Sequence, residues 1–515
     1  MKTTSDLFQL IKSLTKSEKR HFTIFASKHV IGERNNYLKL FKAIDAQEKY
    51  DEAALRKQFE GEIFLKQLPV TKNYLYNLIL KSMRVYRSSA TIEVRLQEML
   101  QDIEFLFEKG MEAQCKKAII KAKELCYEYQ KFRALLIFLE WQRRTTISNS
   151  LNDEEIDALY AEEKDVIRKL ENLHEYNALS SMIFRMHHKH GRPRTEEDFK
   201  KAQEIANHPL LREESTALTE EARVRFYNIR AALAQARGDI QEYYSNSKSL
   251  ITLLEKNPAH KTEDISRYIN MLHNFVDACA QSGNYDELDL TLDKLRSLPA
   301  DCPNMQARIF STVATMETNL LFRLGAPNNA EEVLKRVKSD LAIHVDKMSP
   351  GEVIILKFNL ALSHFILANY REALYWANEV INSDEFQVRK DMYCLGRLFC
   401  LIIHYELGNL DYLEYSVKST YRFLTQRNHL FDFEKATLDF IRRLPRIQSQ
   451  STLIEAFKEL RTQLLKISTE NPFQQTALYT FEFLPWLESK IENVPLLEII
   501  NRRADQRKIQ LQAAA

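Results

Sequence analysis

The feature that most constrains the fold is a series of short turn sequences, most of them centred on a glycine, that recur at nearly constant spacing. The turn residues Gly238, Gly283, Gly325, Ala368 and Gly408 are separated by 45, 42, 43 and 40 residues, and Gly191 precedes them by 47. Glycine can end a helix in the left-handed conformation, and an Asp or Asn after it can cap the next helix. The spacing therefore predicts a row of helical hairpins.

Between these turns, apolar residues recur three or four positions apart, as at Leu360, His364 and Leu367, whereas alternation of period two is hard to find. This periodicity indicates an all-α protein. The chain has 515 residues but only 10 glycines and 12 prolines. Such scarcity argues against strand-and-turn folds and against enzymes built on glycine-rich phosphate loops.

The clearest hairpin is residues 358–386, which read FNLALSHFILANYREALYWANEVINSDEF. This segment resembles a tetratricopeptide repeat, with Ala361 and Ala373 as small residues and Tyr370 as the turn aromatic. Ala377 departs from the family, which usually places an aromatic there, and the period of 40–47 exceeds the family's usual 34. The resemblance covers residues 95–440 approximately and implies an α-solenoid of stacked hairpins. Such scaffolds present many different ligands, so the resemblance specifies little about function.

The distribution of charge and the special requirements of solenoid ends suggest that the chain has three parts. Residues 1–90 carry 17 Lys and Arg against 9 Asp and Glu, whereas the remainder is mildly acidic. We expect a basic helical N-terminal module or cap at 1–90, the solenoid at 91–444 and a helical cap at 445–515, since the end units of a solenoid must differ from the inner ones. Thr15 and Glu18 are predicted to form a capping box.

The start of the chain, LFQLIKSLTKSEKRHFTIFASKH, is similar to a group of uncharacterised bacterial helical-repeat proteins. This similarity implies a bacterial cytosolic setting. The six cysteines form no C-x-x-C pair and lie mostly in apolar helical patterns, which is typical of a reducing compartment. No apolar segment has the length of a secretory signal or a membrane span. We therefore expect a cytoplasmic protein.

In tetratricopeptide arrays the first helix of each hairpin lines the concave groove, so the resemblance suggests lining positions here. The polar ones are Arg225, Asn228, Gln235, Asn270, His273, Asp277, Thr315, Asn319 and Arg323. The apolar ones are Phe358, Leu362, Phe365, Leu398, Ile402 and Tyr405, which are equally well explained as core between longer helices. The family's Lys-then-Asn carboxylate clamp is absent from these positions. These features favour a non-catalytic protein- or peptide-binding scaffold.

The segment LPVTKNYLYNLILKSMRVYR, residues 68–87, predicts an amphipathic helix capped by Thr71. Lys72, Lys81, Arg84 and Arg87 lie on or near the side opposite its apolar stripe. An alternative function is therefore nucleic-acid binding through this module, as a regulator or ribonucleoprotein factor. The preceding helix is predicted to end near Phe59, and a gap of eleven residues is too long for a helix-turn-helix. A simple solvated helix face is the third interpretation.

Nothing in the sequence singles out catalytic chemistry, and no phosphate-binding, zinc-protease, nucleophile-elbow or EF-hand motif occurs. His187, His188 and His190 form the densest histidine cluster. His187 and His188 point about 100° apart and cannot easily share a metal, and His187 with His190 would supply only two ligands, without a carboxylate or thiol nearby. We expect no enzyme, no cofactor and no metal. An enzyme with an unrecognised site would instead show a deep pocket with clustered titratable groups.

Overall fold

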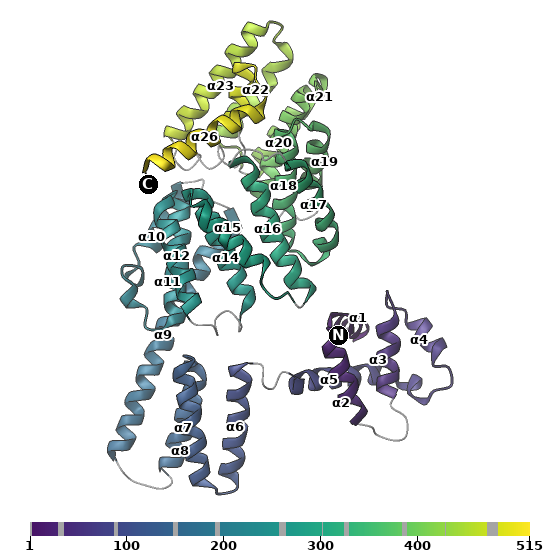
Figure 1. The fold of residues 1–515 in the computed structure, drawn as a ribbon, viewed down its shortest axis with the longest axis vertical. Coiled ribbons are helices and arrows are strands. Elements are labelled where there is room, and N and C mark those ends of the chain that lie inside the picture. The colour runs from purple at the N-terminus through teal and green to yellow at the C-terminus, as the bar shows by residue number, and fades with distance from the viewer. Residues whose placement is uncertain are drawn as a thin grey trace. The chain divides into compact units, whose positions relative to one another are not determined.

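The structure is a computed structural model of the 515-residue chain. It describes residues 3–28, 36–86, 91–147, 153–190, 196–256, 264–300, 302–323, 329–383, 389–427, 429–470 and 483–514. These residues form 24 α-helices and five short 3-10 helices, without a strand among them (Figure 1). The prediction of an all-α protein is confirmed.

The chain divides into two compact units, residues 1–170 and 171–515, which are described separately below. The division falls inside one long helix, α9 (Asp153–His190). The expected boundaries near residues 90 and 444 stay predictions.

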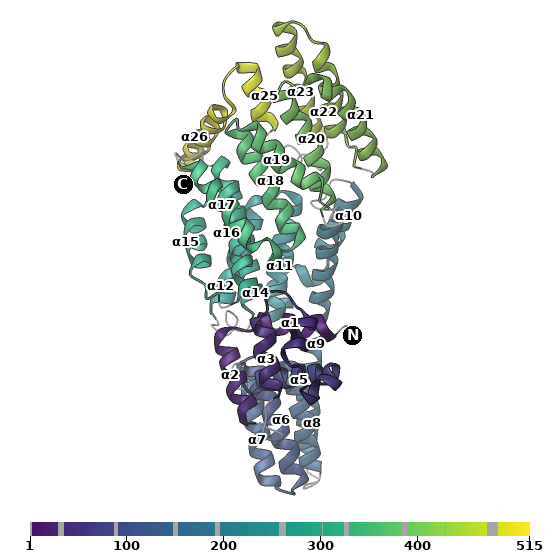
Figure 2. The same ribbon diagram turned by 90° about the vertical axis from the view of Figure 1, so that its right-hand side faces the viewer.

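The first unit contains two separate apolar cores. Its helices are α1 (Thr3–Ser13), α2 (Lys16–Lys28), α3 (Asn36–Ala46), α4 (Glu52–Gln58), the 3-10 helix η1 (Ile63–Gln67), α5 (Leu68–Tyr86), α6 (Ile92–Glu108), α7 (Glu112–Glu128), α8 (Phe132–Ile147) and the first part of α9. One core lies among α1–α5, where α1, α2 and α3 all contact α5. The other lies among α6–α9 (Figure 2).

The start of α2 confirms the capping box, because the Glu18 amide donates to Thr15 Oγ1 at 3.2 Å and the Thr15 amide donates to Glu18 Oε2 at 2.9 Å. The predicted cap of α5 is wrong. η1 leads directly into α5, so the helix begins at Leu68, and Thr71 lies inside it with its hydroxyl donating to the Gln67 carbonyl at 3.1 Å. Pro69 is tolerated there because amides of the first turn need no helical acceptor.

The second unit contains the rest of α9 and a long succession of helices. They are α10 (Glu196–Ala206), η2 (Pro209–Leu211), η3 (Glu214–Thr216), α11 (Glu220–Arg237), α12 (Ile240–Lys256), α14 (Ile265–Ser282), α15 (Tyr285–Arg296), α16 (Pro303–Arg323), α17 (Ala330–His344), η4 (Val345–Lys347), α18 (Pro350–Ile366), α19 (Tyr370–Ile381), α20 (Lys390–Glu406), α21 (Leu410–Gln426), α22 (Asp432–Arg443), η5 (Leu444–Arg446), α23 (Gln450–Glu470), α25 (Phe483–Glu492) and α26 (Leu496–Ala514).

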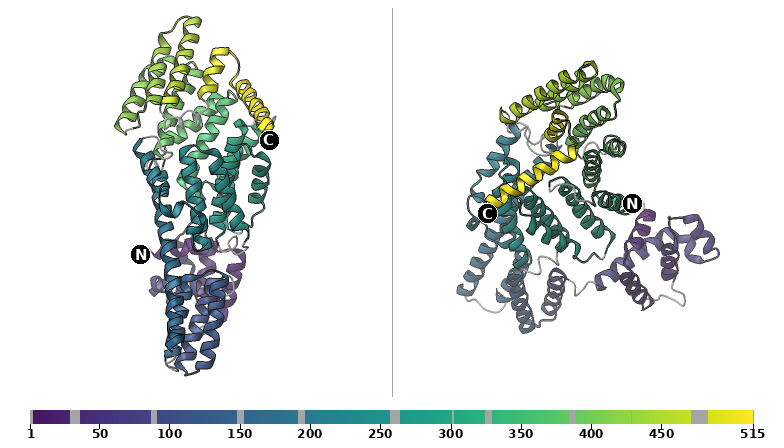
Figure 3. Two further views of the ribbon diagram at one scale, coloured as in Figure 1. Left: turned by 90° about the vertical axis from the view of Figure 1, so that its left-hand side faces the viewer. Right: turned by 45° about the horizontal axis from the view of Figure 1, so that its top comes forward.

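Packing in this unit follows chain order. From α10 to α12, from α14 to α17 and from α18 to α23, consecutive helices pack against each other, and α12 packs against α14. Next-but-one neighbours also touch: α14 with α16, α16 with α18, α18 with α20, and α20 with α22 (Figures 1 and 3). One extended apolar core runs from Ala307 to Ile500, and it includes the small residues Ala361, Ala373 and Ala377.

The turns between these helices share one backbone geometry. Gly238, Gly283 and Gly408 adopt φ angles of 76°, 79° and 75°, and Ala368 takes the same left-handed region at 59°. At each turn the next amide reaches back five residues, as from Asn409 to the His404 carbonyl at 3.0 Å. The expected left-handed helix ends are confirmed at these four positions. Gly191 and Gly325 lie outside the described residues.

The expected caps after these turns are only partly confirmed. Asp239 does cap α12, because its Oδ1 accepts from the Glu242 amide at 2.9 Å. Asn284, Asn369 and Asn409 form no side-chain cap. Their ψ angles of 56–69° differ from the extended backbone that presents a capping side chain to the first turn.

Candidate partner-binding surface

Three helices of the second unit bring most of the predicted polar groove residues together. Arg225 and Asn228 are half-buried on α11, His273 and Asp277 are half-buried on α14, and Asn270 on α14 and Asn319 on α16 are exposed. The side chain of Arg323 lies outside the described residues.

Hydrogen bonds between the helices show that these residues share one surface. Gln235 Nε2 of α11 donates to Asp277 Oδ2 of α14 at 2.9 Å, and Arg308 of α16 donates to Asn270 Oδ1 through Nη2 at 2.6 Å. Residues three, four, seven or eleven positions apart lie on the same side of a helix. Asn228 therefore lies on the side of Gln235, and Asn319 on the side of Arg308. We call the set Arg225, Asn228, Asn270, His273, Asp277 and Asn319 the polar surface.

Asp277 is the most heavily used member of the polar surface. Its Oδ2 accepts from Gln235, from the Tyr243 hydroxyl at 3.1 Å and from Gln281 Nε2 at 2.7 Å. The carboxylate thereby ties α11, α12 and α14 together. Part of the role of Asp277 is therefore structural. The sequence pattern did not identify Tyr243 and Gln281 as its partners, because they do not occupy the expected lining positions.

Arg225 also participates in a contact between helices. Glu221 Oε1 lies 3.0 Å from Arg225 Nη2 on the same helix and 2.8 Å from Arg267 Nη1 on α14. The Arg225 Nε is buried and has no hydrogen-bond partner within the described parts of the chain. Glu221, Arg267 and Arg308 were missed from the sequence, although their spacing on the helices matches the expected register.

Asn228, His273 and Asn319 differ from these residues, because none of them forms a hydrogen bond with another described side chain or with the described backbone outside its helix. Burial lowers the pKa of His273, and the nearby carboxylates of Asp277 and Glu352 only partly oppose that effect. The imidazole is therefore neutral at pH 7 and can both donate and accept a hydrogen bond. These three side chains are the available part of the polar surface.

The expected apolar half of the groove is core. Phe358, Leu362, Phe365, Leu398 and Ile402 are between 0% and 7% exposed, and all belong to the extended core. Of the two interpretations left open by the sequence, packing between long helices is therefore the one observed. Tyr405 is half-buried against the same core.

The basic face of α5 is smaller than expected. Lys72 is only 3% exposed, and its Nζ lies 2.6 Å from Glu52 Oε2 of α4 and over the ring of Tyr50. Hydrogen bonds from Lys72 and then from Arg56 hold the pKa of Glu52 at about 2. The expectation that Lys72 lies on an exposed face is wrong, because the side chains of Tyr50 and Glu52 contact its ammonium group.

Lys81 and Arg84 are exposed as predicted, and neither pairs with another residue that the structure describes. Arg87 lies outside the described residues. The exposed basic face of α5 therefore consists of Lys81 and Arg84, with Asn73 and Asn77 along the same helix.

The second unit also contains two cavities. A cavity of about 690 Å³ lies among α17, α18 and α19, and its charged lining consists of Glu331, Lys335, Lys338, His364, Arg371 and Glu372. Within it Lys338 Nζ lies 3.2 Å from Glu372 Oε2, and the His364 Nδ1 is buried without a partner among the described residues. A cavity of about 380 Å³ lies among α15, α16 and α17.

No cluster of three or more potential metal ligands occurs within the described residues, a set that excludes the side chains of His187, His188 and His190. No described helix combines the length and the apolar character needed to cross a membrane. Family models, curated proteins and solved structures were compared with the chain, and none of the three comparisons gave a match.

Proposed function

We propose that this protein is a non-catalytic scaffold that binds a protein or peptide partner on the polar surface of α11, α14 and α16. The observation that carries the proposal is the availability of Asn228, His273 and Asn319 beside residues that are already engaged between helices. Amide and imidazole groups both donate and accept, so they suit the backbone of a bound peptide.

Support for a tetratricopeptide-like solenoid comes from two features of the second unit. The turns share the same left-handed residue and the same backward hydrogen bond, and next-but-one helices from α14 to α22 touch each other. In a stack of hairpins, the first helix of each hairpin lies against the first helix of the next. Contacts between next-but-one helices are what this arrangement produces. A cytoplasmic, bacterial setting is part of the same proposal.

A test of this function combines affinity purification of the tagged full chain with nuclease treatment and mass spectrometry. We expect a protein partner that survives nuclease and is lost when Asn228→Ala and Asn319→Ala are combined. These substitutions remove available side chains and leave the bonds of Asp277 and Asn270 intact, so thermal stability should change little. A Lys81→Ala and Arg84→Ala variant is the matched control and should retain the partner.

The exposed pair Lys81 and Arg84 favours the second candidate, nucleic-acid binding by the α1–α5 region. If the protein binds nucleic acid in this way, the two variants should have the opposite effects in the affinity purification. Capture would depend on nuclease-sensitive material, would fall steeply as salt rises, and would be abolished by the Lys81 and Arg84 variant. Retention of every partner by the Asn228 and Asn319 variant would count against the scaffold proposal.

A further inference from the structure

The last described helix, α26, has an unusual position in the second unit. Most other helix pairs that pack closely in this unit are neighbours or next-but-one neighbours along the described chain, whereas α26 packs against α16 as well as against α25. In Figure 2, which labels both helices, the yellow α26 runs from α25 toward the teal helices in the middle of the unit. It therefore covers a surface that belongs to a much earlier part of the chain.

The side of α26 that faces the unit is apolar. Ile499, Ile500 and Ala504 are each 3% exposed, and Leu496 and Leu497 pack partly buried against the extended core. Leu496, Ile500 and Ala504 are four residues apart, which aligns them along one side of the helix. Glu498 and Arg502 are exposed. This is the pattern of an amphipathic helix seated on an apolar surface.

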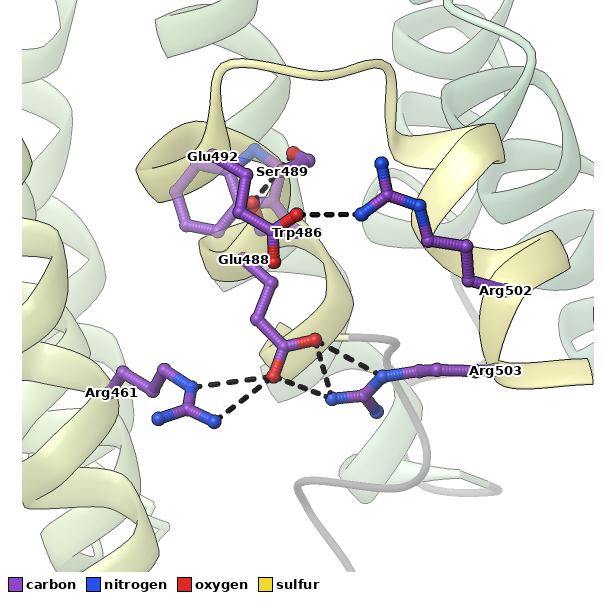
Figure 4. Close-up of polar contacts among 7 residues, drawn as sticks. All are labelled: Arg461, Trp486, Glu488, Ser489, Glu492, Arg502 and Arg503. Atoms are coloured by element: carbon purple, nitrogen blue, oxygen red, sulfur yellow. Dashed lines mark hydrogen bonds and ion pairs between the residues drawn. The ribbon is translucent and has the colours of Figure 1, made fainter. Parts of the chain in front are cut away.

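Helices α25 and α26 are joined by the ion pairs Arg503–Glu488 and Arg502–Glu492 (Figure 4). Arg503 Nη2 of α26 lies 2.7 Å from Glu488 Oε2 and 2.8 Å from Oε1, and Arg461 Nη2 of α23 lies 3.2 Å from Oε1. Arg502 pairs with Glu492 at 2.7 Å. Arg503 thus fixes the register of α26 with a two-pronged contact to one carboxylate.

The two helices are held by different polar contacts. α25 is anchored by Glu406, a side chain that is 7% exposed and accepts from both Trp486 Nε1 and Lys490 Nζ at 2.6 Å. The ion pair of Arg503 with Glu488 is 31% exposed at the arginine and 18% exposed at the carboxylate. A change at Arg503 therefore acts on the seat of α26 and leaves the Glu406 contacts of α25 in place.

The connection between the two helices is a short turn. Asn493 has a φ angle of 56°, a left-handed conformation that a non-glycine residue adopts at some cost, and Pro495 follows immediately before α26. The helical backbone ends at Glu492 and begins again at Leu496, so α25 and α26 are two separate segments.

From these contacts we infer that α26 is an internal ligand that covers a helix-binding surface reaching from Glu488 to α16. The partner that this surface fits is an amphipathic helix with apolar residues at the spacing of Leu496, Ile500 and Ala504 and an arginine that reaches Glu488. The inference rests on the proposed function, because it names the partner class of the same unit, whose α16 also carries Asn319 of the polar surface.

The test uses the full chain and two labelled peptides of residues 494–514, one of natural sequence and one with Arg503→Glu. In the Arg503→Glu chain, repulsion from Glu488 should release α26, while Glu488 remains available to an added peptide. We expect the natural peptide to bind this variant at least about tenfold more tightly than it binds the natural chain, because the internal competitor is weakened. The Arg503→Glu peptide should bind neither chain.

Hydrogen exchange supplies a second measurement on the same samples. Amides of α26 should exchange faster in the Arg503→Glu chain, while those of α25 keep their protection. Faster exchange without binding of the natural peptide would overturn the helix-binding surface, and unchanged exchange would overturn the displaceable helix. A milder Arg503→Gln chain replaces the variant if charge reversal prevents folding.

Two further outcomes are informative. If the Arg503→Glu chain becomes a dimer at the concentrations used, the occupant is a second copy of this chain, and the inference of a separate partner is overturned. If the natural peptide binds but no cellular partner is captured in the affinity experiment, the helix-binding surface stands and the scaffold function fails.

Discussion

Helices α5 and α18 both have apolar residues three or four positions apart, but α18 is the more apolar of the two, and they occupy different kinds of site. α5 buries one stripe, with Leu68, Leu75 and Ile79 toward α1–α3, and its other side is exposed. In α18 six consecutive residues, 358–363, are all buried, because α16, α19 and α20 surround it. In α1–α5 the helices share one small core around α5, whereas in the row of helices each helix packs mainly against its nearest neighbours. A core mutation should therefore weaken all of α1–α5 but only the helices close to the mutated one in the row.

The largest expected effects come from core truncations in the two settings. Phe365→Ala in α18 removes a ring that is 1% exposed and lies 5.1 Å from the ring of Phe399, and we expect a loss of about 3–5 kcal/mol in the free energy of unfolding. Phe22→Ala in α2 is the matched change, since this ring is 0% exposed and lies 4.6 Å from Phe41. Chemical denaturation measures both losses.

Hydrogen exchange on the same two variants tests the comparison itself. In the row of helices, protection should fall mainly in α18 and the helices that touch it, because stability is shared with nearest neighbours. In α1–α5 all five helices should lose protection together, because they share one small core. Equal loss of protection across the whole second unit would contradict the description of a row.

A smaller effect separates the two sides of α5. Lys72→Ala leaves the Tyr50 and Glu52 side chains without their buried partner, and we expect a loss of about 1–3 kcal/mol in unfolding free energy. Lys81→Ala, on the exposed side of the same helix, should change stability by less than about 0.5 kcal/mol. Equal effects in urea denaturation would mean that the contacts of Lys72 with Tyr50 and Glu52 contribute nothing to stability.

A comparable pair of changes tests the turns of the second unit. Ala368→Gly should stabilise the unit by roughly 1 kcal/mol, because glycine adopts the left-handed region without the cost that alanine carries. Gly408→Ala should destabilise it by about the same amount, since an added Cβ there meets no atom within 4 Å and only the backbone conformation is penalised. Thermal denaturation of both variants checks the opposite signs.

The smallest expected effect is a dependence on pH in the second unit. Burial lowers the pKa of His273, His364 and His404 from the ordinary value of 6.5. The unfolded chain therefore binds protons first, so their contribution to stability is complete above pH 6.5 and is lost as the pH falls through the lowered values.

Thermal denaturation between pH 7.5 and pH 5 measures this dependence. Gln at the three histidine positions should flatten the profile, because glutamine does not titrate in this range. An unchanged slope would show that these histidines do not cause the loss of stability at acid pH.

Parts of α5 were predictable from the sequence and parts were not. Its amphipathic pattern correctly indicated that Leu75, Leu78 and Ile79 are buried and that Lys81 and Arg84 are exposed. The pattern did not show that Tyr50 and Glu52 contact Lys72, because a contact with another segment leaves no trace in the local period. Thr71 was misjudged as a cap because the 3-10 helix before α5 has no strong sequence signal.

The candidate site shows the same division. The turn register identified the helices and sides on which Asn228, Asn270 and Asn319 lie. It could not tell which side chains are available, because Asn270 bonds to Arg308 while Asn228 and Asn319 have no partner among the described residues. Hydrogen bonds between helices depend on rotamers and distances that only the packed structure defines.

What the sequence determined by itself is the local structure: helices from the spacing of apolar residues, and left-handed turns at Gly238, Gly283, Ala368 and Gly408. What only the tertiary structure decided is which surfaces remain open. Phe358 and Leu362 became core, Lys72 became a buried ion pair, and α26 came to lie on α16. The physical reason is that the helical period arises within one or two turns of chain, whereas burial depends on other segments that lie outside that local stretch of sequence.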